Sequence, residues 1–300
     1  MLANGQPIQY FNRYTEEVET EQIYCEKPLR WTYETGLGRS TLEAVVKRPF
    51  LSVFYGYLMS GKSTKQRVAP FIETYGLDPG EFADEPESYR SFNEFFYRKL
   101  KRSARPVCDG EGEIAFPADG RHLAVPNIGD EDRFFVKGQR FQLAALLGSG
   151  ELADRYAGGT LVLSRLCPVD YHRYHFAIGG EASPVWLLNG PLYSVSPIAL
   201  QRNLEYLWRN KRTLTEIDTA GAGKVLQLEI GATNVGSINA TFQPGTVAKG
   251  DEKGYFAFGG SATITVFERE AVRLADDLRA QSAECRELYA HMGDVMATAR

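Results

Sequence analysis

Residues 249–267 read KGDEKGYFAFGGSATITVF, and this stretch indicates how the C-terminal half of the chain folds. An aromatic run, residues 255–258, is followed by two glycines and then by a run rich in β-branched residues from Ser261 to Phe267. Because aromatic and β-branched side chains favour strands, both runs are predicted to be strands. The glycine pair between them marks a bulge, a bend or a close backbone approach, although a plain hairpin turn is the simplest interpretation of the tripeptide alone.

Short strands of the same kind are predicted before this stretch. Residues 160–164 and 224–230 are rich in Val, Leu and Ile and are bounded by Gly, Pro and Asp residues. Such runs, separated by turn-forming residues, are typical of a β-rich domain. From residue 106 onward we therefore predict short strands, closed by an amphipathic helix over residues 270–286.

Residues 40–105 favour helices instead. Ser40 stands where an N-terminal cap is expected, and residues 91–94 read SFNE, the pattern of a capping box. Residues 1 to about 35 are predicted to be a poorly defined lead-in. The whole is an α+β fold in two parts: an N-terminal lead-in and helical, membrane-facing region over residues 1–105, and a β-rich catalytic domain over residues 106–300.

The bulk composition narrows the class of protein. The 300 residues carry a formal net charge of −4, and no zinc-finger or P-loop pattern is present, so a nucleic-acid partner is not expected. The four cysteines are scattered without a CxxC pair, which predicts reduced thiols. The N-terminus lacks the pattern of a signal peptide, and the longest apolar stretch, residues 51–59, is too short to span a bilayer.

The basic residues are unevenly distributed. Residues 30–67 contain seven basic and only two acidic side chains, together with the aromatic, apolar run 49–59. Cationic residues that flank such a run suit a helix lying in a membrane interface, although an ordinary buried helix gives the same pattern. The pattern alone leaves both alternatives open, and a lipid substrate would favour a peripheral protein on the cytoplasmic side of the cell membrane, in contact with anionic lipid.

Two further stretches carry side chains that could activate a serine. Residues 117–120 read PADG and place Asp119 in a tight turn, while residues 170–175 read DYHRYH and supply His172 and His175. A carboxylate that orients an imidazole, and an imidazole that takes a hydroxyl proton, are what a weak serine nucleophile needs. Each stretch also has a simpler interpretation: a turn for the first, and structural histidines or an incomplete H-x-x-H metal pair for the second.

Taken together, these stretches resemble the phosphatidylserine decarboxylases. The resemblance is carried by residues 117–120, 170–175, 249–261, the GATNVG run at 231–236 and the YRSFNEFFYRKLK run at 89–101, and it covers about residues 65–270. One position departs from the family pattern, because Ala262 stands where Thr or Ser usually follows the cleavage serine. That change removes one hydroxyl from the site but not the attacking one.

The resemblance implies a self-processing enzyme. Ser261 would attack the carbonyl of Gly260 and cut the chain into residues 1–260 and 261–300, which remain associated. Ser261 would then become a pyruvoyl group, so that no metal or external cofactor is needed, and this carbonyl would serve as electron sink while phosphatidylserine is converted to phosphatidylethanolamine and carbon dioxide. The resemblance assigns His175 as the base for cleavage with Asp119 as its orienting partner, which leaves His172 to donate a proton in each turnover.

Two other functions stay open from the sequence. A related pyruvoyl enzyme could decarboxylate a soluble amino acid, and residues 247–251 resemble the lysine hairpin of a non-enzymatic lipoyl or biotinyl carrier domain, although Lys249 lacks the usual neighbours. An ordinary serine hydrolase is disfavoured because no serine has a G-x-S-x-G elbow around it. The sequence leaves open whether the chain forms a homodimer.

Overall fold

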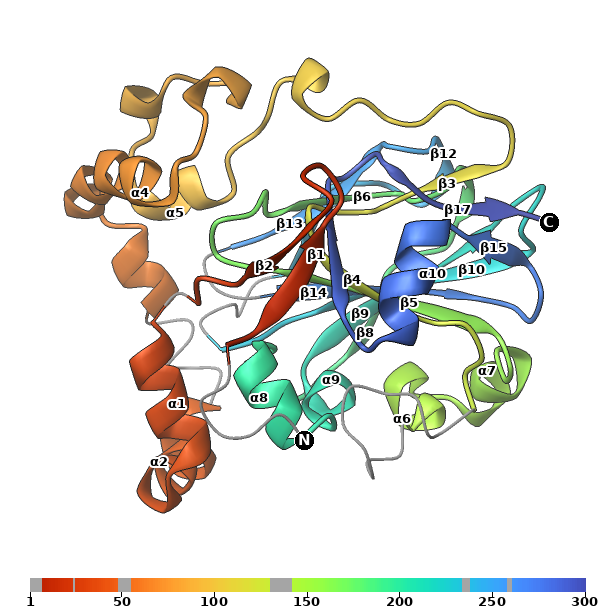
Figure 1. Ribbon diagram of the computed structural model, residues 1–300, viewed down its shortest axis with the longest axis horizontal. Helices are drawn as coiled ribbons and strands as arrows, with labels where there is room; N and C mark the ends of the chain where they lie inside the picture. Colours follow the sequence, from red (N-terminus) through yellow and green to blue (C-terminus); the bar gives the residue numbers. More distant parts are fainter. Residues whose placement is uncertain (1–6, 24, 48–54, 130–141, 234–237, 258–260) are drawn as a thin grey trace.

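The computed structural model describes residues 7–23, 25–47, 55–129, 142–233, 238–257 and 261–300. Its centre is an 11-stranded, mostly antiparallel sheet (Figure 1). From one edge to the other the strands are β12 (Gly245–Val247), β7 (Gly180–Ala182), β9 (Arg212–Asp218), β10 (Lys224–Ile230), β14 (Ser261–Phe267), β5 (Thr160–Leu166), β4 (Gly120–Val125), β16 (Glu287–Ala290), β1 (Gln9–Asn12) and β2 (Glu17–Thr20), and β8 (Trp186–Leu188) pairs with β9.

The three strands predicted from the β-branched runs are central to this sheet. Strand β14 lies between β10 and β5 and is antiparallel to both, with Thr263 opposite Glu229 on one side and Ser164 on the other. Each of these strands is almost completely buried. Their sequences are rich in apolar and β-branched residues, which is why the sequence predicted them well.

Two small sheets pack against one face of the large sheet. The first contains β11 (Ile238–Ala240), β13 (Glu252–Phe256) and β6 (Arg173–His175), and the second contains β15 (Val272–Leu274), β17 (Val295–Ala299) and β3 (Glu113–Ala115). The second sheet and α10 (Asp276–Ala283) share an apolar core with the large sheet, in which Phe267 and Val162 contact residues such as Ile114 and Leu278.

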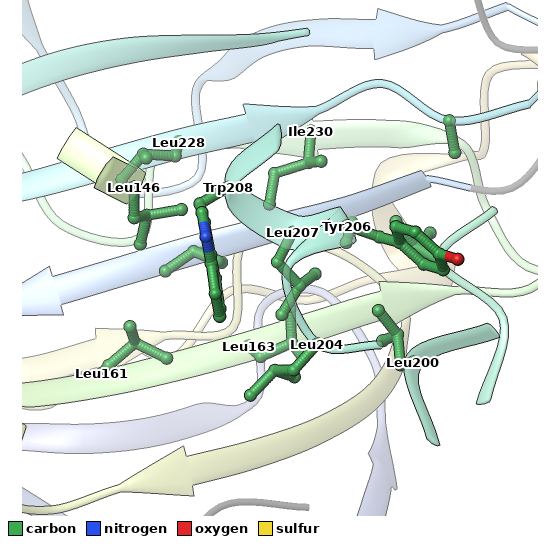
Figure 2. Close-up of a cluster of buried hydrophobic side chains, with 14 of the residues drawn as sticks. Leu146, Leu161, Leu163, Leu200, Leu204, Tyr206, Leu207, Trp208, Leu228 and Ile230 are labelled. Carbon is green, nitrogen blue, oxygen red and sulfur yellow. The ribbon is translucent and has the colours of Figure 1, made fainter. Parts of the chain in front are cut away.

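The opposite face of the large sheet is covered by short helices. Figure 2 shows Leu161, Leu163 and Ile230 of the strands facing Trp208 and Leu146 of these helices, all of them buried. This apolar layer fixes the position of strands β5, β10 and β14. The helices are α6 (Leu143–Leu147), α7 (Gly150–Arg155), α8 (Pro197–Arg202) and α9 (Tyr206–Arg209).

The helices of the N-terminal region lie along one side of the molecule, in red and orange in Figure 1. Among the described residues, no helix is both long and apolar enough to cross a membrane. The elements are α1 (Glu26–Glu34), α2 (Gly36–Thr41), the π-helix η1 (Leu42–Val46), a helical turn at 55–59, η2 (Lys62–Arg67), α4 (Val68–Tyr75), η3 (Pro79–Glu81), η4 (Pro86–Ser88), α5 (Phe92–Phe96) and η5 (Arg102–Ala104).

One helix cap was predicted correctly and one was not. The Ser91 hydroxyl accepts the Glu94 N–H at 3.2 Å and caps α5 as predicted, although the Glu94 carboxylate bonds the N–H of Arg90 instead of Ser91. Ser40 does not begin a helix. It lies inside α2, whose cap is Thr35, and its hydroxyl donates to the Gly36 carbonyl at 3.2 Å.

Two further predictions are corrected by long-range pairing. Residues 9–20 are not a poorly defined lead-in, because β1 pairs parallel with β16 and antiparallel with β2 and so extends the central sheet. The helix predicted for residues 270–286 is only α10, because residues 272–274 form β15 and pair with β17. In both cases a partner strand far away in sequence decides the local structure.

Candidate active site

Ser261 is the first residue of β14 and is fully buried. Its Oγ has no hydrogen-bond partner among the described residues, and the same holds for the buried hydroxyls of Thr263 and Thr265 on this strand. The backbone of Ser261 is held in register opposite Leu166 of β5. Gly260, the other half of the predicted cleavage site, lies outside the described residues, as do residues 258–259.

The face of the sheet that carries the Ser261 side chain is polar near this end. Cross-strand pairing aligns Thr213, Glu229, Thr263, Ser164 and His122 in one row across five strands, and all five are buried. Side chains two residues apart on a strand point to the same face, so the serine at the head of β14 lies on the face of this row. The large sheet thus carries a buried polar strip on the face that also holds Val162 and Phe267, whereas its opposite face packs against the short helices through apolar side chains.

His172 lies beside the segment that leads to Ser261. Its backbone carbonyl accepts the Phe256 N–H at 2.9 Å, and Phe256 ends the strand that precedes the predicted cleavage site. The imidazole Nδ1 is 3.0 Å from the Asp170 carbonyl oxygen, and the ring packs against Phe96 with centroids 3.8 Å apart. Two separate contacts therefore fix the His172 ring.

His175 is held by its backbone on the neighbouring strand β6. Its N–H donates to the Pro117 carbonyl at 2.8 Å, and its carbonyl accepts from Gln227 Nε2 at 2.6 Å. The Nδ1 atom is buried and has no hydrogen-bond partner among the described residues. Burial lowers the pKa of His175 to about 4, against the weaker opposing effect of the Glu252 and Asp119 charges. The ring is therefore neutral at physiological pH, as a base must be.

Asp119 is buried and its charge acts on His175, but its hydrogen bonds are to other groups. Its carboxylate accepts the Arg105 Nε–H at 2.9–3.0 Å and the Met292 N–H at 2.8 Å. No direct Asp119–His175 hydrogen bond occurs among the described residues, and the carboxylate acts on His175 through its charge. The following Gly120 is required by close packing, since a Cβ there would lie 2.5 Å from the Arg165 carbonyl oxygen.

A buried ion pair links the two sheets that carry His175 and Ser261. Lys253 lies at a bulge of β13 and bonds Glu229 of β10, and both side chains are almost completely buried. Burial lowers the pKa of Lys253, whereas the Glu229 charge opposes that shift. The Thr213 hydroxyl donates to the second Glu229 oxygen at 2.7 Å. A bulge re-aims a side chain, and here it directs the ammonium between the sheets.

More buried charges lie at the end of strands β4 and β5. Arg121 bonds Asp170 at 2.6 Å, and Arg165 bonds Glu21 and Glu287, each at 2.6 Å. Sequence reasoning missed these residues and Lys253, because local sequence does not distinguish a buried charge from a solvated one. The sequence pointed to just one of these residues, Asp170, because it belongs to the DYHRYH run.

The metal-site and carrier interpretations find no support among the described residues. No group of three or more potential metal-ligating side chains occurs in that part of the chain, so the H-x-x-H pair lacks further ligands there. Lys249 is not presented for modification, because its ammonium donates to the Glu113 carbonyl at 2.9 Å. The hairpin therefore does not resemble a carrier in this respect.

Comparison with known proteins shows which family this chain resembles over most of its length. The family model described as phosphatidylserine decarboxylase matches residues 92–295. Proteins named phosphatidylserine decarboxylase proenzyme are similar over nearly the whole chain: one from Fusobacterium nucleatum is 42% identical over 97% of both chains, one from Chlamydia muridarum 42% over 96% of both, and one from Ruminiclostridium cellulolyticum 40% over 96% of this chain and 97% of its own. This chain belongs to the phosphatidylserine decarboxylase family.

Proposed function

We propose that this protein is a self-processing phosphatidylserine decarboxylase, which converts phosphatidylserine to phosphatidylethanolamine and carbon dioxide. The observation that carries the proposal is the buried Ser261 hydroxyl, which has no partner among the described residues and stands at the head of a central strand. The word proenzyme in the names of the relatives supports cleavage of the chain. Cleavage between Gly260 and Ser261 would convert Ser261 to a pyruvoyl group.

Self-cleavage would begin at the Ser261 hydroxyl. A neutral His175 takes the hydroxyl proton, and the oxygen attacks the Gly260 carbonyl, so that an ester replaces the peptide bond. Loss of the Ser261 α-proton then expels the Gly260 carboxylate and leaves dehydroalanine at position 261. Addition of water and release of ammonia give the pyruvoyl carbonyl. An unpartnered, buried hydroxyl suits the first step because it loses no existing hydrogen bond.

Asp119 would support His175 electrostatically. Its negative charge raises the pKa of His175 against the effect of burial, which favours the imidazolium that forms when the serine proton is transferred. Arg105 and the Met292 N–H hold this carboxylate in place. A direct hydrogen bond to His175, as in serine-protease triads, is not required for this effect.

The two fragments would remain associated after cleavage. Residues 261–300 contribute β14 to the centre of the large sheet, where it pairs with β10 and β5, and β16 to the same sheet. They also contribute β15, α10 and β17 to the apolar core. Separation would expose all of these surfaces to water, which opposes dissociation.

The pyruvoyl carbonyl, once formed, supplies an electron sink for the bond between the substrate α-carbon and its carboxylate. The chain's own residues would do the rest. His172, fixed by Asp170 and Phe96, would return a proton to the α-carbon after carbon dioxide leaves. The backbone carbonyl of His172 bonds the N–H of Phe256, which ends the strand that precedes position 261, and this contact supports the assignment.

The N-terminal helices would bring the protein to anionic membrane on the cytoplasmic side. Large apolar side chains are exposed here, including Leu37 at 71% and Tyr57 at 77%, with Trp31 and Leu58 also exposed. Such side chains next to basic residues suit an interfacial contact. Arg48, one of the basic residues of this window, lies outside the described residues.

Co-sedimentation with anionic vesicles tests this role. Binding should weaken in a Leu37→Glu variant and in high salt, whereas unchanged binding would contradict the membrane role.

A decarboxylation assay tests the proposed function. Wild-type protein should release carbon dioxide from phosphatidylserine in mixed vesicles, and Ser261→Ala, which cannot be processed, should release none. Free serine is the matched soluble substrate. Release from serine but not from phosphatidylserine would favour the soluble-amine decarboxylase instead, and no release from either by fully cleaved protein would contradict both functions.

A further inference from the structure

A polar cavity of about 480 Å³ opens beside the candidate active site. It lies between the N-terminal strands, the end of α4 and the loop that leads to His172. Asp119, Asp170 and Tyr171 line it, so it borders two of the stretches that carry the family resemblance. Arg98, from the chain that follows α5, is also part of its lining.

Arg98 is a buried cation without a carboxylate partner among the described residues. Its Nε and Nη1 atoms are buried and form no hydrogen bond in that part of the chain, and Nη2 reaches only the Val169 carbonyl at 3.4 Å. The guanidinium carbon lies 5.0 Å from the Phe82 ring centroid and 4.8 Å from that of Phe95. Burial lowers the pKa of Arg98 to about 10, so the group is still charged at neutral pH. Buried guanidinium groups normally use their donors.

The other two arginines of the cavity are neutralised. Arg105 bonds Asp119 at 2.8 Å, and Arg121 bonds Asp170 at 2.6 Å, with all four side chains buried. Among the described residues that line the cavity, Arg98 is thus the one guanidinium without an anion. The two aromatic rings within 5.0 Å of its guanidinium carbon restrict how this group can move.

The remaining carboxylates of the lining limit which ligands fit. Glu81 pairs with Arg105, Asp78 accepts the Gly80 N–H at 2.8 Å, and Glu19 accepts the Tyr10 hydroxyl at 2.7 Å. These three carboxylates already accept hydrogen bonds from the protein, but their negative charges disfavour a ligand that carries only negative charge. A ligand with both a phosphodiester and an ammonium group suits this distribution better.

We propose that Arg98 binds the phosphodiester of the substrate headgroup in this cavity. The proposal rests on the proposed function and names the part of the substrate that the cavity recognises. A phosphodiester offers two oxygens to the planar guanidinium, which suits its paired donors. The alternative anion, the serine carboxylate, is lost as carbon dioxide, and a strong ion pair with it would stabilise the ground state and slow the reaction. The phosphate keeps its charge throughout.

Binding of glycerophosphocholine to the cleaved holoenzyme tests this inference. This probe has the phosphodiester but neither a reactive amine nor a carboxylate. Titration calorimetry should give an affinity at least about tenfold weaker for Arg98→Gln than for the wild type, and an intermediate affinity for Arg98→Lys, which keeps the charge but loses the fork. The matched control is Arg90→Gln, because Arg90 lies on the same segment, is exposed and pairs only with Glu94.

Three outcomes would overturn the inference. One is equal affinity for glycerophosphocholine in the wild type, Arg98→Gln and Arg98→Lys. Another is an equal loss in Arg90→Gln. If Arg98→Gln does not fold, the comparison of Arg98→Lys with the wild type still tests the site. A third test is inhibition of decarboxylation by the wild type, in which glycerophosphocholine should compete with the substrate and choline should not. Equal inhibition by both compounds would contradict a phosphate site. Because binding is measured without turnover, a cleaved protein that binds the probe but decarboxylates nothing would contradict the proposed function and leave the Arg98 site standing.

Discussion

The chemistry at the residue scale depends on groups that are buried without their usual partners. Ser261 Oγ and His175 Nδ1 both lack hydrogen-bond partners among the described residues. Leaving such groups unpaired costs about 1–3 kcal/mol each, so a fold that retains them has a reason to do so. We propose that this reason is a reaction between them, and two predictions at the residue scale test the proposal.

The first prediction concerns His175 as the base. His175→Ala should stall self-cleavage, and the protein should still fold because no side-chain hydrogen bond of His175 is lost at Nδ1. In the wild type the lowered pKa of about 4 keeps the base neutral above that pH, so the cleavage rate should be flat from about pH 6 to 8 and fall as pH drops toward 4. Freshly synthesised chain, sampled over time on a denaturing gel at each pH, gives both results. Normal cleavage in the variant would remove the assignment.

The second prediction separates His172 from His175 by timing. His172→Ala should cut itself nearly normally yet lose decarboxylation by a factor of about a hundred, which is typical of a missing general acid. Gel mobility and released carbon dioxide are measured on the same preparation. An uncut variant would mean that both imidazoles serve cleavage, and a cut, fully active one would mean that the proton comes from elsewhere.

At the element scale, the contacts between sheets position these residues. Strand β6 carries His175 and strand β14 carries Ser261, and the Lys253–Glu229 pair together with the Gln227–His175 hydrogen bond holds their two sheets face to face. A buried ion pair of this kind adds little net stability when compared with apolar side chains of similar size. Its loss from one side only is costly, because the remaining charge stays buried.

A double-variant comparison tests this link in the uncut Ser261→Ala protein. Lys253→Met should lower the free energy of unfolding by about 3–5 kcal/mol, and adding Glu229→Gln should restore much of it, because no lone buried charge remains. The matched control is Lys224→Met, since Lys224 pairs with Glu216 across neighbouring strands but is 40% exposed, and little change is expected. Denaturant titration measures all three. A double variant no more stable than Lys253→Met would contradict the ion-pair explanation.

The elements also differ in how far the sequence predicts them. Strands β10 and β14 were predicted residue for residue, because a covered strand carries its hydrophobic and β-branched signal within itself. Strands β1 and β15 were missed, because their short, mixed sequences become strands only by pairing with β16 and β17. The residues of the candidate site also differ in how far the sequence predicts them. Ser261 stood out through its glycines, whereas nothing near Arg98 or Lys253 in sequence reveals burial.

At the scale of the whole molecule, cleavage should change the covalent structure but not the assembly. The C-terminal fragment would place strands in two sheets, with β14 paired on both sides. Cleaved protein should therefore elute as one species in native gel filtration and separate into two only in denaturant. Dissociation under native conditions would contradict the expectation that the fragments hold one core. The division of the chain near residue 105 stays a prediction.

The most direct test of the central claim is the intact mass of the purified protein under denaturing conditions. Wild type should give two chains, residues 1–260 and 261–300, and the small chain should be blocked to N-terminal sequencing and react with a carbonyl reagent. Ser261→Ala should give one full-length chain that does not react. A wild-type chain that stays at full length after folding would contradict self-processing, and Ala262 would then be the first position to restore to Thr.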